Sequence, residues 1–132
     1  MLVSVEHELP AYLIGTRQGV PPDVFQELWK RLAEKGWQNK GLLVTRTPSD
    51  AATDCITPDE VLTTDTGPTL EIVPTPAHSI TILAPRLHEL RKIAVTELTA
   101  LGAGLLGSGI HPCVSSSEDD YDRLRTPRKA YD

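Results

Sequence analysis

Two glutamates near the amino terminus have the side-chain type and the spacing of metal ligands. Glu6 and Glu8 are two residues apart in the segment Leu2–Glu8, where Val3 and Val5 occupy the alternate positions. Because side chains alternate between the two faces of a strand, both carboxylates are expected on one face. Like charges at this separation repel, and a divalent cation between them removes the repulsion; oxygen ligands suit Mg²⁺ or Mn²⁺. The alternative interpretation is a strand face that simply contacts solvent.

A third candidate is Glu71, which lies in an apolar run between Leu70 and Ile72. If its strand neighbours the first one, its carboxylate joins the same face. Carboxylates from adjacent antiparallel strands are suited to binding Mg²⁺ with a nucleoside triphosphate. Here too, the solvent face of an alternating strand is the alternative.

The histidines and glycines give weaker signals. His111 follows a glycine-rich stretch and precedes Pro112, so it is either a substrate contact or a histidine packed at a strand end. His7 lies between the two glutamates and is expected to face away from them. The glycines from Gly102 to Gly109 match neither the GxGxxG nor the GxxxxGK(S/T) spacing of nucleotide-binding loops. In addition, the stretch follows a predicted helix, whereas such loops precede one.

Charge and composition exclude several classes of protein. The net charge is −5 and the basic residues are scattered, which argues against nucleic acid as a partner. The densest basic group is either a solvated tail or an anion contact, and consists of Arg123, Arg125, Arg128 and Lys129.

No segment has the ~20 apolar residues of a membrane helix, and Glu6 and Glu8 interrupt any signal peptide. Cys55 and Cys113 lack metal or redox spacing, so we expect a cytoplasmic protein with two idle thiols.

The elements that must position these residues follow from periodicity. Helices are expected from Pro21-Pro22-Asp23 to about Lys35, and from about Ser79 to Leu101, because apolar residues recur there every three or four positions. Pro10 is expected to limit the first strand and keep it from the centre of a sheet. The predicted strands are Leu2–Glu8, Leu42–Thr45, Thr53–Ile56, Glu60–Thr64, Thr69–Val73 and one within Gly102–Gly109.

This order, β-α-β-β-β-β-α-β, predicts an α+β fold in which two helices cover one face of a largely antiparallel sheet. Residues 1–112 are expected to form the folded part. Residues 113–132 are polar and without periodicity, and we expect them to be mobile or to lead into a further part of a larger protein.

Three stretches together resemble the glutamate–cysteine ligase family, carboxylate–amine ligases of the glutamine synthetase-like fold. Residues 4–9 (SVEHEL) are similar to the family's opening Gly-x-Glu-x-Glu strand, with Ser4 in place of glycine. Residues 64–76 (TDTGPTLEIVPTP) resemble its hairpin ending in Leu-Glu and proline. The third stretch is the predicted second helix with residues 106–112 (LGSGIHP), followed by residues 126–131 (TPRKAY); it resembles the family's Gly-x-His-Pro strand end and its Pro-Lys-x-Arg-Tyr segment.

The resemblance implies a partial ligase catalytic domain over residues 1–112, using ATP and Mg²⁺ (or Mn²⁺) to join glutamate to an amine such as cysteine. It implies that Glu6, Glu8 and Glu71 are metal ligands and that His111 and Arg128 bind substrate. It assigns no catalytic or nucleotide-binding residue. The family's arginine before the tyrosine is Ala130 here, so substrate binding through this segment differs unless Arg128 replaces it.

The family continues beyond this length, so we expect the chain alone to be incomplete and inactive. A second chain or a homodimer would then cover the open sheet. Two alternatives stay open. One is a non-catalytic interaction or regulatory module derived from the same fold, and the other is an unrelated α+β domain whose acidic strand faces solvent.

Overall fold

The structure, a computed structural model, describes residues 1–106. Their core is a six-stranded sheet in the order β2-β3-β4-β5-β1-β6, in which every neighbouring pair is antiparallel. The elements along the chain are β1 (His7–Leu13), α1 (Pro22–Ala33), β2 (Gln38–Asn39), β3 (Leu43–Arg46), β4 (Glu60–Asp65), β5 (Thr69–Val73), α2 (Ile80–Ala100) and β6 (Ala103–Leu105). The predicted α+β class is confirmed: two helices pack against an antiparallel sheet.

Both helices lie where their apolar periodicity places them. α1 has proline at its first position and an acidic residue, Asp23, in its first turn, and Gly36 follows it with a φ of +98°. At the start of α2, the Ser79 side chain accepts a hydrogen bond from the backbone N–H of Ile82. Gly102, with a φ of +75°, turns the chain from α2 into β6. None of the described helices is both long and apolar enough to cross a membrane.

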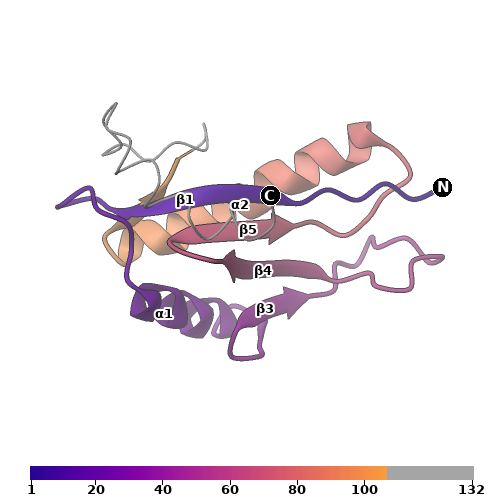
Figure 1. Cartoon of the computed structure of the whole chain (residues 1–132). Helices are drawn as coiled ribbons and strands as arrows, with labels where there is room; N and C mark the ends of the chain where they lie inside the picture. The colour runs from indigo at the N-terminus through magenta and orange to yellow at the C-terminus, as the bar shows by residue number, and fades with distance from the viewer. Residues whose placement is uncertain (107–132) are drawn as a thin grey trace.

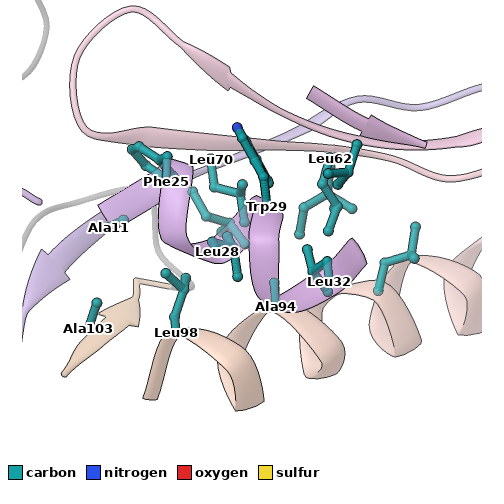
Figure 2. Packing of buried hydrophobic residues seen from close by; sticks show 14 of the residues in the cluster. Ala11, Phe25, Leu28, Trp29, Leu32, Leu62, Leu70, Ala94, Leu98 and Ala103 are labelled. Atoms are coloured by element: carbon teal, nitrogen blue, oxygen red, sulfur yellow. The ribbon is translucent and has the colours of Figure 1, made fainter. Parts of the chain in front are cut away.

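One face of the sheet and both helices form the hydrophobic core. Leu9 and Leu70 are paired across β1 and β5 and are fully buried, as are Leu62 and Ile72 across β4 and β5. Figure 1 shows α2 passing behind β1 and β5. In Figure 2, Leu28 and Leu32 of α1 point toward Ala94 and Leu98 of α2. Because all of these side chains belong to one cluster, the helices pack against the same face of the sheet.

The first strand was predicted in the wrong place. β1 begins at His7 and passes through Pro10 to Leu13, whereas Val3 forms only an isolated bridge with Ala77. Nor does Pro10 keep β1 from the interior, because β1 lies between β5 and β6. The carbonyl of Pro10 accepts a hydrogen bond from the N–H of Leu106, just past the end of β6. The missing N–H of proline therefore falls beyond the β6 ladder and interrupts nothing.

Two further differences concern short strands. Thr53–Ile56 was predicted as a strand and is instead turn and bend, held by a hydrogen bond from the Cys55 N–H to the Ala52 carbonyl. The two-residue strand β2, which was not predicted, pairs with β3 at the edge of the sheet. The element order therefore matches the prediction, but one strand belongs to a different segment. Residues 107–112 and 113–132 lie outside the described residues.

Candidate metal centre

The register of β1 against β5 brings the predicted carboxylates together. Glu8 is directly opposite Glu71 in the ladder, and Glu6 precedes Glu8 by two residues on the same face. Their alternate neighbours Leu9 and Leu70 are fully buried beneath the helices. We call the opposite side, which carries Glu6, Glu8 and Glu71, the carboxylate face. Sequence alternation placed each glutamate on a face, and strand pairing placed them beside one another.

The hairpin between β4 and β5 adds a fourth acid. β4 pairs with β5 so that Thr63 is opposite Glu71 and Asp65 is opposite Thr69. The turn is closed by a hydrogen bond from the Thr66 N–H to the Asp65 carboxylate, and Gly67 has a φ of +81° that favours glycine. Asp65 therefore sits at the turn end of the strand next to Glu71, on the same face.

The electrostatics of this face are unfavourable for charge on Glu71. The pKa of Glu71 is raised to about 7, first by partial burial and then by a hydrogen bond to Glu6 and by the charges of Glu6, Glu8 and Asp65. Among the described residues no lysine, arginine or histidine forms an ion pair with Glu6, Glu71 or Asp65. Near neutral pH, then, Glu71 is held between a protonated and an ionised state.

The donor chemistry of this face fits a hard divalent cation. Glu6 and Glu71 already share a hydrogen bond, which brings one carboxylate oxygen of each together. No three histidine, cysteine, aspartate or glutamate side chains within residues 1–106 converge closely enough to hold a metal ion as they stand. Mg²⁺ commonly uses one or two carboxylates and fills its remaining positions with water and phosphate oxygens. The close pair Glu6 and Glu71, with Glu8 beside it, therefore suits Mg²⁺ better than a metal held only by protein.

The structure describes three of the four histidines but neither of the other predicted site residues. His111 and Arg128 lie outside the described residues. His7 faces the helices, opposite to the glutamates as expected, and its Nδ1 is buried with no hydrogen-bond partner within residues 1–106. His78 instead lies 3.3 Å from the Asp54 carboxylate, at the surface.

Sequence reasoning missed two buried carboxylates on the helix side. Glu97 of α2 is 3% exposed and accepts hydrogen bonds from Arg31 (3.0 Å) and Lys35 (2.5 Å) at the carboxyl end of α1. These two cations lower the pKa of Glu97, although burial alone would raise it. Glu60 is 5% exposed and pairs with Arg46 at 2.8 Å. The charge at Glu97 interrupts the apolar stripe of α2, and its sequence signal was the basic pair Arg31, in the last turn of α1, and Lys35, just past its end.

A hollow of about 500 Å³ lies between α1 and the β4–β5 hairpin. Phe25 and Trp29 form its inner wall, and the exposed Leu42 and the turn residue Pro68 stand at its margin. In Figure 2 the indole nitrogen of Trp29 points away from α2. Asp65 lines this hollow, and its charge also helps to raise the pKa of Glu71. The hollow therefore adjoins the carboxylate face at one end of β4.

Comparison of the chain with known protein families, with curated proteins and with solved structures found no match.

Proposed function

We propose that the carboxylate face binds Mg²⁺ or Mn²⁺ together with the phosphates of ATP. On this proposal the chain is the amino-terminal part of an ATP-dependent ligase of the glutamate–cysteine ligase type, with a partial glutamine synthetase-like fold. The observation that carries the proposal is the gathering of Glu6, Glu8 and Glu71 on one face, with the pKa of Glu71 raised to about 7. Like charges placed together at a cost in free energy are typical of functional sites.

A cation would relieve this electrostatic conflict. Glu6 and Glu71 would hold the ion, and their carboxylates would then face a dication in place of a proton and each other. Two carboxylates leave most of an octahedral shell for water and for the β- and γ-phosphate oxygens of a nucleotide. A cation held there would supply charge neutralisation for the transferring phosphoryl group.

The reaction then takes two steps. A glutamate γ-carboxylate oxygen attacks the γ-phosphorus of ATP, the bond from that phosphorus to the bridging oxygen breaks, and ADP leaves with the electron pair. The resulting acyl phosphate is attacked by the amine of cysteine or a similar acceptor. Phosphate leaves, the amine loses a proton, and an amide bond remains. The contribution of this chain is to hold the phosphates and to orient the carboxylate for in-line transfer.

The sheet architecture also supports the proposal. Both helices pack on the face opposite to the carboxylates, so none of the described helices covers Glu6, Glu8 or Glu71. Glu6 is exposed and Glu71 is half-buried, which leaves the pair accessible to a ligand yet partly removed from water. Partial removal from water strengthens the attraction between carboxylates and a dication.

Thermal unfolding with and without Mg²⁺–ATP tests the proposal. A ligand at 100 times its Kd stabilises the native state by about 2.7 kcal/mol, so the melting midpoint should rise by several degrees. The double variant Glu6→Gln, Glu71→Gln should fold and lose this rise. Glu27→Gln is the matched control, because it removes one negative charge from an exposed ion pair on α1 and should keep the full shift.

No shift in the wild-type chain, or an equal shift in the double variant, would overturn the proposal. The non-catalytic module would then become the leading interpretation, and it predicts a dimer in solution that covers the carboxylate face.

A further inference from the structure

We infer that Tyr12 is a stacking platform for the purine base of the nucleotide. This inference rests on the proposed function, because it places the base relative to phosphates held by Glu6, Glu8 and Glu71. Tyr12 belongs to the same strand and face as Glu8, since Leu9 and Ala11 between them are fully buried on the helix side. The phenol is half-buried, so part of its ring is accessible.

The backbone of Tyr12 pairs with two glycines, and one of them lies against its ring. Its ladder partner on β6 is Gly104, and on its other side it forms a bridge with Gly19. A Cβ atom at Gly104 would lie 3.0 Å from both Cζ and Oη of Tyr12 and 3.3 Å from Cε1. The ring therefore lies across the β6 backbone and not upright from the sheet. A side chain at Gly104 would force it to move.

Two prolines lie near Tyr12 in the sheet. Pro68 covers Gly19, where an added Cβ would lie 2.7 Å from the Pro68 Cγ atom. Pro10 precedes Tyr12 by two residues on the same face. Pro10 and Pro68 therefore place apolar surface near the strand position of Tyr12, next to the carboxylates. A nucleotide needs this combination, because its phosphates require a cation and its base requires a flat apolar surface.

The spacing agrees with the size of the ligand. Glu8 and Tyr12 are four residues apart on one strand, which corresponds to about 13 Å at the usual rise per residue. That length is comparable with the span from the terminal phosphates to the base of an extended nucleoside triphosphate. Tyr12 needs no sequence-specific contact for this role, because any purine presents a π-face to it.

Calorimetric titration of the full chain with two Mg²⁺ complexes, ATP and inorganic tripolyphosphate, tests the inference. Tripolyphosphate has the phosphates without the base. Tyr12→Leu should weaken ATP binding about tenfold or more, as expected for loss of base stacking, and leave tripolyphosphate binding unchanged. Tyr12→Phe keeps the ring and should bind both ligands as the wild type does. Gly104→Ala, which displaces the ring, should resemble Tyr12→Leu.

Leu42→Ala is the control for the hollow beside α1, because Leu42 is 78% exposed and lines that hollow. It should change neither affinity. If Tyr12→Leu weakens both ligands equally or neither, or if Leu42→Ala is the variant that weakens ATP, the inference is wrong while the proposed function stands. If the wild-type chain binds neither Mg²⁺ complex, both are wrong.

Discussion

On the helix side of the sheet, both buried carboxylates that the structure describes have basic partners, whereas on the opposite side Glu71 is hydrogen-bonded to another acid. Glu97 is bonded to Arg31 and Lys35, and its pKa is lowered. Glu71 has no such partner within residues 1–106, and its pKa is raised to about 7. The same side-chain type is thus stabilised as an anion on one face and destabilised on the other.

This contrast separates a structural role from a functional one. A buried charge that only supports the fold is compensated, because leaving it unpaired costs several kcal/mol. Carboxylates that repel one another near the surface lower stability, and a sequence keeps them where a ligand restores the balance. On the proposed function, the helix side accounts for stability and the carboxylate face for binding.

The largest loss of stability is expected from shortening a side chain of β5 that faces the hydrophobic core. Leu70→Ala removes a fully buried side chain and should lower the free energy of unfolding by about 2–5 kcal/mol, measured by urea denaturation. Val73→Ala on the same strand is the control on the carboxylate face, where the side chain is half-buried, and should cost about 1 kcal/mol. Equal losses at the two positions would mean that both faces contribute alike to the core.

A smaller loss of stability is expected from removing the charge of Glu97, which Arg31 and Lys35 compensate. Glu97→Gln should lower the free energy of unfolding by about 1–2 kcal/mol at pH 7. The loss is moderate because Arg31 and Lys35 are partly in water, so leaving them without an anion costs less than it would for fully buried cations. Because the folded pKa of Glu97 is depressed, its contribution is present above the unfolded pKa and is lost as pH falls through the folded one. Denaturation between pH 7 and 3 should therefore show the wild type and Glu97→Gln converging at acidic pH. A constant gap would contradict the ion-pair explanation.

The smallest expected change in stability is a gain, and it comes from removing the charge of Glu71. The raised pKa of Glu71 means that the folded state holds a proton that the unfolded state has released, so stability falls as pH rises from about 4.5 through about 7. Glu71→Gln should remove this pH dependence. It should be the more stable protein at pH 8 without divalent cations, by about 1 kcal/mol or less because the group is partly solvated. A variant less stable than the wild type at pH 8 would show that the Glu71 anion is favourably bound.

The parts of the fold that the sequence predicted well are those with regular periodicity. The apolar spacing of Val24–Lys35 and the long stripe ending near Leu101 identified both helices, and alternation identified β4 and β5. The first strand was displaced because alternation from Leu2 to Glu8 continues in Leu9 and Ala11, and Pro10 outweighed that pattern in the prediction. Strand β2 has only two residues, too few for any period to be recognised.

The candidate site was predictable only in part. Alternation assigned each glutamate to a face, but the pairing of β1 with β5 depends on contacts between residues far apart in the chain, such as Glu8 and Glu71, which are 63 positions apart. The role inferred for Tyr12 depends on its pairing with Gly104 and Gly19, which lie in different parts of the chain and come together only in the sheet. The partners of Glu97 were missed for the same reason, since helix packing and not sequence spacing brings them together.

Proton release on metal binding tests the central claim most directly. Titrating Mg²⁺ into the full chain at pH 7, in two buffers of different ionisation enthalpy, gives the number of protons displaced per cation bound. Because the pKa of Glu71 is about 7, the account predicts release of roughly half a proton, falling toward zero at pH 8.5 and abolished in Glu71→Gln. Magnesium binding with no proton release at pH 7, or no binding in either buffer, would contradict the claim that this carboxylate pair is a cation site.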